Sequence, residues 1–428
     1  MTISAPSNAM RIYNLFPPLA GRVQQWKPHL ERAADMGFNW IFVNPIQMLG
    51  RSGSLYSIKD YFTIDPAWVD PDSASPADEQ VREIIRFAAD LGLTMMVDLV
   101  INHCAYDAPL LKEHPEWFAT EDGQIAHPYC LHDGEKVVWR DLARFDHHTR
   151  DQDGLFNYCK QIVDYLASLG FRGFRCDAAY QIPEAFWRRL IQEIRRDSPE
   201  TVFAAETLGC SADQTRQTAK AGFDYLFNSS KWWDFSSPWL MEQYHLTREV
   251  APSISFPESH DTPRLAAEFH GNIDALKQRY LFAALFSAGV MIPMGYEFGF
   301  TKALDVVNTK PSDWEQTSID LTAFIREVNR LKSSYPVFQE ESLTEVLNHP
   351  NPSILVLWKA CSKNGGEALL LLNKDPWHRQ HFYIEDLYQY VQSAPPLIDV
   401  SPEWPMDFLP NPFDYELPPG MGRVLISA

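Results

Sequence analysis

The chain has 428 residues, of which 45% are hydrophobic, and it carries a formal net charge of −19. This composition supplies a sizeable core and excludes a disordered or fibrous chain. The negative charge predicts that neither nucleic acid nor an anionic membrane is a partner, because both are polyanions. The N-terminal segment MTISAPSNAM does not have the basic stretch followed by an apolar stretch that is typical of a signal peptide. No window of 18 apolar residues occurs, so we expect a cytoplasmic protein that does not span a membrane.

Apolar runs of strand length alternate with amphipathic segments of helical period. The runs are residues 11–16, 39–46, 94–102, 171–178, 201–208, 224–230, 253–260 and 289–297. They are continuously apolar, which is typical of strands buried on both faces of a parallel sheet. Among the helices, we expect Ser75 to be the N-cap of one and Ser211 with Gln214 to form a capping box at another. Eight strand–helix units predict an α/β fold, a closed (β/α)8 TIM barrel.

Two segments depart from this alternation. Residues 104–150 are polar and too long for an ordinary strand–helix loop, which predicts a short inserted lobe after the third strand. After about residue 338, short strands follow one another between turns rich in Pro and Gly, which predicts an antiparallel β-sandwich. The expected domains are therefore an N-terminal tail (1–10), a catalytic barrel (11–103 and 151–337), the inserted lobe (104–150) and a C-terminal domain (338–428).

Charged side chains occur where the apolar runs end. Four of the runs end in or near an acid, and several of these acids have a basic neighbour. The residues concerned are Asp98 and His103, Arg175 and Asp177, Glu206, and His260 and Asp261. A single acid at a strand end is usually a cap or half of a salt bridge. Four strands of one barrel deliver these acids to the same rim, where active sites of this fold lie, so we expect a catalytic site there.

Paired carboxyl groups are suited to breaking an acetal bond between sugars. An ionised carboxylate meets the positive charge that develops on the anomeric carbon, and a protonated carboxyl protonates the leaving oxygen. We expect Arg175 to lower the pKa of Asp177, and neighbouring carboxylates to raise the pKa of Glu206 to about 6–7. A retaining mechanism predicts that the two carboxyl groups lie about 5–5.5 Å apart.

The segments DLVINH, GFRCDAA, AAETL and SHD, in this order, resemble the four short conserved regions of the α-amylase family of retaining glycoside hydrolases. The resemblance spans most of the chain. It implies that Asp177 is the nucleophile, Glu206 the general acid/base and Asp261 a third carboxylate that grips the sugar. It also implies sugar-binding roles for a further set of residues, with Tyr56 stacking on the sugar. They are Tyr56, Asp98, His103, Arg175, His260 and Arg264.

Details of the sequence place the chain near one branch of this family, but with departures. HPEWF, FAAETL and GYE are similar to the branch that contains maltosyltransferases using maltose 1-phosphate. That branch usually has Asn after the nucleophile, where this chain has Ala178. The resemblance implies no required cofactor. Calcium is an unproven ligand to which only Asn102 is assigned, because Tyr180 and Gln181 replace the Lys–His pair of common α-amylases.

We expect a retaining α-glucosidic hydrolase or transglycosylase acting on short α-glucans or small α-glucosides, so that its partner is a small carbohydrate. The alternative is a transferase that moves glucosyl or maltosyl units to an acceptor other than water. A catalytically inactive sugar-binding barrel disagrees with the intact acids. A metal-dependent barrel hydrolase disagrees with the first run, RIYNLF, which lacks His-x-His. The aromatic segment KWWDFSSPW is either rim packing or a platform for further sugar units.

Overall fold

Eight parallel strands close into a barrel in the computed structural model, which describes residues 9–132, 135–362, 366–392 and 396–427. Residues 1–8 of the expected N-terminal tail lie outside the described residues. The predicted barrel is confirmed, with the closed strand order β1-β16-β15-β14-β13-β12-β5-β2. The strands are β1 (Arg11–Leu15), β2 (Trp40–Val43), β5 (Thr94–Leu99), β12 (Gly173–Cys176), β13 (Val202–Glu206), β14 (Tyr225–Phe227), β15 (Ser253–Ser255) and β16 (Gly289–Pro293).

Both faces of the barrel strands are buried. Ile12 of β1 packs inside the barrel with Phe42 and Met96, whereas its neighbour Tyr13 packs outward in the cluster that lies between strands and helices. Each strand therefore fills two cores, which explains its continuous apolar sequence. No helix of the described residues combines the length and apolarity needed to cross a bilayer.

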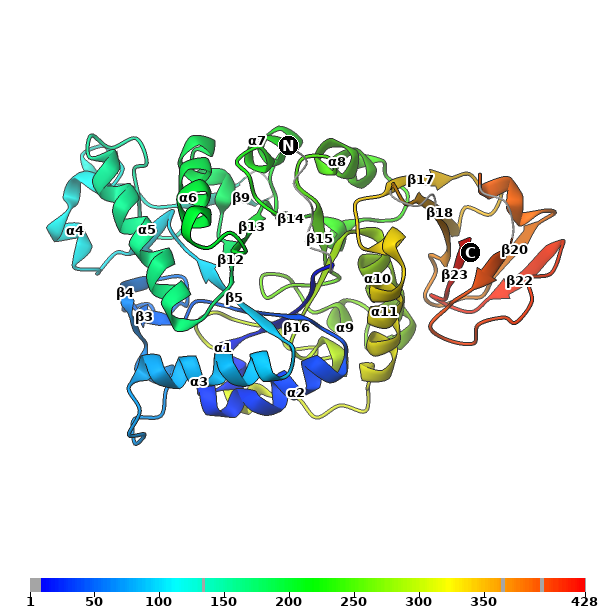
Figure 1. The fold of residues 1–428 in the computed structure, drawn as a ribbon, viewed down its shortest axis with the longest axis horizontal. Coiled ribbons are helices and arrows are strands. Elements are labelled where there is room, and N and C mark those ends of the chain that lie inside the picture. Colours follow the sequence, from blue (N-terminus) through cyan, green and yellow to red (C-terminus); the bar gives the residue numbers. More distant parts are fainter. Residues whose placement is uncertain (1–8, 133–134, 363–365, 393–395, 428) are drawn as a thin grey trace.

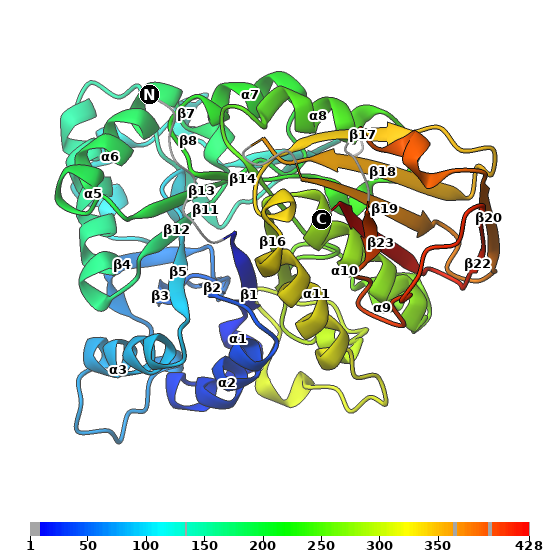
Figure 2. The same cartoon turned by 45° about the vertical axis from the view of Figure 1, so that its right-hand side comes forward.

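Helices surround the barrel on its outside, as Figures 1 and 2 show. They are α1 (Pro17–Ala20), α2 (Lys27–Asp35), α3 (Ala77–Asp90), α5 (Gln152–Leu169), α6 (Glu184–Asp197), α7 (Ala212–Ala219), α8 (Trp239–Thr247), α9 (Leu265–Glu268), α10 (Ile273–Phe286) and α11 (Thr322–Ser334). α7 begins with the predicted Ser211–Gln214 capping box. α3 begins at Ala77 with Pro76 as N-cap and no side-chain cap, so the prediction of Ser75 as N-cap is wrong. The Ser75 main chain instead accepts a hydrogen bond from the Gln80 side chain at 2.9 Å.

A lobe of short elements lies between β5 and α5, in cyan at the left of Figure 1. β6 pairs with β11 in antiparallel fashion directly after the third barrel strand, and the β9–β10 hairpin follows the same rim. The lobe's elements are β6 (His103–Ala105), α4 (Leu110–Glu113), β7 (Thr120–Glu121), β8 (Gln124–Ile125), β9 (Tyr129–His132), β10 (Glu135–Val138) and β11 (Leu142–Arg144). A separate two-stranded sheet, β3 (Gln47–Leu49) with β4 (Ile58–Ile64), follows β2.

The C-terminal part is antiparallel β-structure, as predicted, and lies beside α10 and α11 in Figure 2. Five strands form one sheet in the order β17-β18-β19-β23-β21, and β20 pairs with β22. Leu355 and Leu357 of β18 pack toward the barrel, whereas Val356 and Trp358 pack against residues of the β20–β22 pair. The strands are β17 (Leu343–Leu347), β18 (Ile354–Ala360), β19 (Glu367–Asn373), β20 (Gln380–Ile384), β21 (Leu397–Asp399), β22 (Phe413–Leu417) and β23 (Gly422–Ser427).

Candidate active site

The predicted acids meet at the carboxyl end of the barrel. Asp98 lies in β5, Asp177 follows β12, Glu206 is the last residue of β13 and Asp261 follows β15. Because all eight strands run parallel, these ends open on one mouth of the barrel. The structure therefore brings together side chains that are far apart in the sequence.

One guanidinium group holds the acids together. Arg175, in β12, is buried, and its Nη1 donates to Asp98 Oδ1 and to Asp177 Oδ1, both at 2.9 Å. Its Nη2 lies 3.5 Å from Glu206 Oε2 and 3.8 Å from Asp261 Oδ2. All three predicted catalytic carboxylates thus contact one cation, which reduces their mutual repulsion and fixes their relative positions.

Burial raises the pKa of Asp177 to about 7, although Arg175 lowers it as the sequence predicts. Arg175 does lower this pKa, but Asp98 and Asp261 raise it again. The physical reason is that the single cation is shared by four carboxylates, while desolvation acts fully on each buried one. Sequence adjacency reveals the cation but not the acids that compete for it.

Burial also raises the pKa of Glu206 to about 7, as predicted, with Asp177 and Asp261 raising it further. Asp261 differs from both. Desolvation raises its pKa, but the His260 imidazole, whose Nε2 lies 3.0 Å from Oδ2, and Arg175 outweigh that effect and lower the pKa to about 2. The site thus offers two carboxyl groups that titrate near neutrality beside one that stays ionised.

Tyr56 is held by hydrogen bonds of its phenol group. The Tyr56 hydroxyl donates to Asp98 Oδ2 at 2.7 Å, lies 2.7 Å from His260 Nε2 and accepts from Asn44 Nδ2 at 3.0 Å. Its ring lies parallel to the His260 imidazole, with a centroid distance of 5.9 Å and an interplanar angle of 10°. The ring is therefore fixed at the mouth of the barrel, and its stacking on a sugar stays a prediction.

His103 lies beneath this group. Its Nε2 is 3.1 Å from the Tyr56 main-chain oxygen, and burial lowers its pKa to about 4, so the ring is neutral near pH 7. The buried Nδ1 has no hydrogen-bond partner within the described part of the chain. The structure thus places His103 as a support of Tyr56.

Arg264 does not join the cluster, although the sequence predicts a contact with substrate. Its side chain is 1% exposed, and it donates to Glu258 Oε1 at 2.7 Å, to the Met294 oxygen at 2.9 Å and to the Lys302 oxygen at 3.2 Å. Each guanidinium nitrogen therefore already has an acceptor within the barrel. We assign Arg264 to the packing of the barrel, since a buried cation with its own carboxylate partner has little reason to face a sugar.

Two residues of the site were missed by the sequence analysis. Asn44 follows β2 and supports the Tyr56 hydroxyl, and Asn14 of β1 donates to Asn44 Oδ1 at 2.9 Å. Both are buried. The signal that identified the acids, a polar residue at the end of an apolar run, applies to Asn44 as well.

The aromatic segment after β14 divides between packing and exposure. Trp233 is 2% exposed and packs against Phe282, with a centroid distance of 5.3 Å. Trp232 is 51% exposed. Packing therefore explains Trp233, and a platform role for Trp232 stays a prediction.

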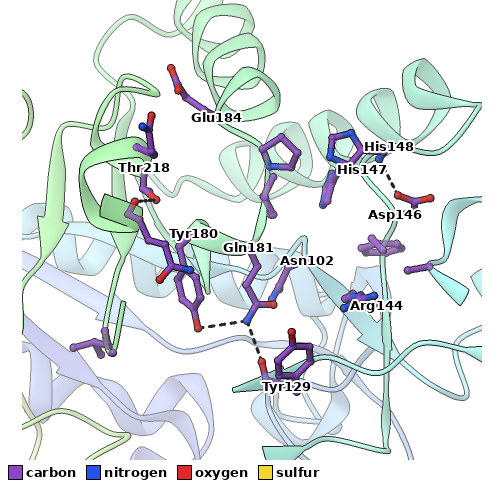
Figure 3. Close-up of a pocket in the computed structure, with 18 of the residues that line it drawn as sticks. Asn102, Tyr129, Arg144, Asp146, His147, His148, Tyr180, Gln181, Glu184 and Thr218 are labelled. Atoms are coloured by element: carbon purple, nitrogen blue, oxygen red, sulfur yellow. Dashed lines mark hydrogen bonds between the residues drawn. The ribbon is translucent and has the colours of Figure 1, made fainter. Parts of the chain in front are cut away.

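A cavity of about 890 Å³ is lined in part by residues that follow β12 and β13, among them Tyr180 and Leu208. It lies between the inserted lobe, the turn after β12 and α7, so three separate stretches of chain form its walls. In Figure 3, Gln181 lies between Tyr180 and Tyr129, and its Nε2 is 3.4 Å from the Tyr180 hydroxyl and from the Tyr129 main-chain oxygen. Asn102 lies beside them. Aromatic rings next to amide groups are suited to a polyhydroxylated ligand.

Calcium is a ligand that the family resemblance leaves open. Asn102 Oδ1 is a buried oxygen without a hydrogen-bond partner among the described residues. Within the same residues, however, no three His, Cys, Asp or Glu side chains are grouped so that they could hold a metal ion. Since calcium takes six to eight oxygen ligands, usually with several carboxylates, we assign it no part in the chemistry.

Comparison with known proteins agrees with this geometry. Residues 4–122 match the model of the glycogen debranching enzyme, glucanotransferase domain. The chain is 25% identical over 389 residues to the α-1,4-glucan:maltose-1-phosphate maltosyltransferase of Burkholderia pseudomallei, covering 87% of this chain and 34% of that protein. For the same enzyme of Methylacidiphilum infernorum, the values are 25% over 391 residues, 85% and 58%. In sequence the chain is therefore similar to these maltosyltransferases over most of its length, and its first part is similar to that glucanotransferase domain.

The fold of this chain is also seen in solved structures. An α-amylase from Lactobacillus plantarum superposes with a TM-score of 0.76 at 20% identity, covering 99% of both chains. The chain spans only 34% and 58% of the two maltosyltransferases that it resembles in sequence. Within this chain, the likeness to the solved structure extends over the barrel and the C-terminal sheet.

Proposed function

We propose that this protein is a retaining α-glycoside hydrolase or transglycosylase that cleaves α-glucosidic bonds in short α-glucans or small α-glucosides. The observation that carries the proposal is the arrangement of Asp177, Glu206 and Asp261 around Arg175 at the barrel mouth. The pKa values of Asp177 and Glu206, both about 7, allow one to be ionised while the other is protonated at neutral pH.

The chemistry follows from these two states. The Asp177 carboxylate attacks the anomeric carbon while Glu206 transfers its proton to the leaving oxygen, so that a glycosyl ester forms and the glycosidic bond breaks. In the second step the Glu206 carboxylate takes a proton from water or from a sugar hydroxyl. The oxygen of that water or hydroxyl attacks the same carbon and releases Asp177. Asp261, with a pKa of about 2, stays negative beside the positive charge of both transition states.

Transfer of the sugar to an acceptor other than water is a second candidate function, and the cavity favours it. Tyr180 and Leu208, which line it, lie three residues after Asp177 and two after Glu206 in the sequence, so the cavity is close along the chain to both carboxyl groups. Its volume of about 890 Å³ is in the range of sites for small ligands. In the first step the cavity would hold the sugar that leaves. In the second step it would hold the sugar that accepts the glycosyl group.

The test of the proposed function is a panel of maltose, maltooligosaccharides, trehalose, sucrose and glucosylglycerol, with and without added acceptor, followed by NMR of the first product formed. We expect an α-anomer as the first product, because two inversions retain the configuration. Asp177→Asn should lower kcat at least about 10³-fold because it removes the nucleophile. Asp164→Asn, on the exposed face of α5, is the matched control and should leave kcat unchanged. A β-anomeric first product, or an active Asp177→Asn enzyme, would exclude the mechanism.

A further inference from the structure

The residue after the proposed nucleophile has an unusual backbone. Ala178 has φ 41° and ψ 43°, the left-handed conformation that residues with a Cβ rarely adopt. Alanine has no polar side chain that could compensate locally, as Asn or Asp would. Such a conformation persists only where the surrounding structure imposes it, and it concentrates at functional sites.

The conformation aims a main-chain hydrogen bond at Glu206. β12 and β13 are parallel, with Cys176 opposite Ala205. Just beyond this pair, the Ala178 N–H donates to Glu206 Oε2 at 2.7 Å. The main chain that carries Asp177 thus also holds the carboxyl group of Glu206.

This contact distinguishes the two oxygens of Glu206. Oε2 faces the Ala178 N–H and, at 3.5 Å, Arg175 Nη2, and both groups can only donate. Oε2 therefore accepts in either protonation state, and the proton of the neutral acid is on Oε1. We propose that Ala178 is a positioning residue, whose strained backbone keeps Oε2 occupied so that Glu206 Oε1 alone delivers and removes the catalytic proton.

The inference deepens the proposed function and rests on it for the role of Glu206. Five ionisable groups face Glu206 from the neighbouring elements: Arg175, Asp177, Tyr180, Cys210 and Asp261. None of them is altered when the Ala178 N–H alone is removed. The contribution of this hydrogen bond is therefore separable from theirs.

The experiment replaces Ala178 by lactic acid through nonsense suppression, which exchanges the N–H for an ester oxygen and keeps the methyl group. We expect the pKa of Glu206 to rise by about one unit, since an anion loses a donor and gains a facing oxygen. ¹³C NMR titration of labelled glutamate carboxyls measures it, with the Glu206 signal identified by its loss in Glu206→Gln. The basic limb of the pH profile of kcat/KM should move to higher pH together with this pKa. This titration does not depend on turnover, so an inactive wild type would contradict the proposed function while the positioning is still measured.

The matched control is the same ester at Ala288, whose N–H donates to the buried Glu341 Oε1 at 2.9 Å far from the site. It should leave the pKa of Glu206 unchanged. Ala178→Gly, which keeps the N–H and tolerates the left-handed backbone, should also leave it unchanged. Ala178→Val, whose branched side chain disfavours this backbone, should raise it, and this variant decides the matter if the ester protein does not fold. The proposal would be overturned if the pKa of Glu206 did not move in the Ala178 ester protein, or if it shifted equally in the Ala288 ester protein. Where the Ala178 ester protein does not fold, an unmoved pKa of Glu206 in Ala178→Val would overturn it.

Discussion

Asp177 and Glu206, both with a pKa of about 7, form a coupled pair, because Asp177 raises the pKa of Glu206 and both carboxyl groups share the Arg175 cation. Two interacting groups of equal pKa lose their protons in two steps that belong to the pair. The form with one proton exists between these steps, and it is the form in which one group is the nucleophile and the other the acid. The near-identity of the two pKa values therefore favours a narrow range of working pH.

We predict that kcat/KM passes through a maximum near pH 7 and falls on both sides. Below pH 7 Asp177 takes up a proton and ceases to be a nucleophile, and above pH 7 Glu206 loses the proton that the leaving group needs. A pH–rate profile with an unactivated α-glucoside measures both limbs. In Glu206→Gln, which cannot ionise, the basic limb should disappear when an activated aryl α-glucoside, whose leaving group needs little acid help, is the substrate. A wild-type plateau from pH 4 to 9 would contradict the assignment.

The residue scale also shows what sequence can predict about a site. Asp98, Asp177, Glu206 and Asp261 are visible because an acid at the end of an apolar run is locally anomalous. The competition of four carboxylates for Arg175 is not visible in the sequence, since it depends on side chains from separate strands. For the same reason the sequence predicts the lowering of the Asp177 pKa by Arg175 but not the larger rise that burial, Asp98 and Asp261 cause.

At the scale of elements, strand and helix types follow from periodicity, whereas helix ends depend on partners. The Ser211–Gln214 capping box is local in sequence, and it is found as predicted. At α3 the cap residue is Pro76, because Gln80 takes the Ser75 carbonyl as a partner. The C-terminal end of α10 has no left-handed cap at all, since Ser287 is extended.

Two buried lysines complete that end of α10. Lys332 of α11 donates to the Ala284, Ser287 and Phe338 oxygens at 2.6–2.8 Å, and Lys359 of β18 donates to the Phe286 oxygen. Ammonium groups placed there satisfy free carbonyls and the negative end of the helix dipole. Lys359 is thereby one of the side chains that join the C-terminal sheet to the barrel, as is Gln278, which donates to the Asn373 oxygen.

We predict that Lys359→Met lowers the free energy of unfolding by about 1–3 kcal/mol, because it leaves a buried carbonyl without its donor. Burial lowers the pKa of Lys359 to about 8, below its usual value, so the folded state binds fewer protons than the unfolded state between about pH 8 and 10. Wild-type stability should therefore rise with pH across that window, and the variant should lose this contribution. Urea unfolding at pH 7 and 10 measures both effects.

Lys160→Met is the control for this prediction. Lys160 forms an exposed pair with Asp164 within α5, and such pairs contribute little to stability. Its unfolding free energy should stay within about 0.5 kcal/mol of wild type. If Lys359→Met were equally mild, the lysine would not be the group that completes α10.

At the scale of the whole molecule, the barrel and the C-terminal sheet could be predicted from sequence, but the cavity could not. The barrel repeats one pattern eight times, and each repeat supports the others. The cavity instead depends on how the lobe, the turn after β12 and α7 lie against one another. The Tyr129 main-chain oxygen, 52 positions away in the sequence, approaches the Gln181 amide only once these parts are assembled.

The cavity leads to a last prediction, on the balance between hydrolysis and transfer. If a sugar acceptor binds there, Tyr180→Ala removes an aromatic wall of its site but leaves Asp177 and Glu206 in place. Loss of one such ring contact is worth about 1–1.5 kcal/mol, which is a five- to tenfold change. We therefore expect the ratio of transfer to hydrolysis, measured from product yields at fixed acceptor concentration, to fall by about this factor. Hydrolysis of an activated aryl α-glucoside, whose leaving group needs little help, should change far less. Tyr106→Ala is the matched control, because Tyr106 lies on the lobe, packs against the His127 ring and does not line the cavity. An unchanged ratio in Tyr180→Ala would mean that the acceptor binds elsewhere and that the cavity has another use.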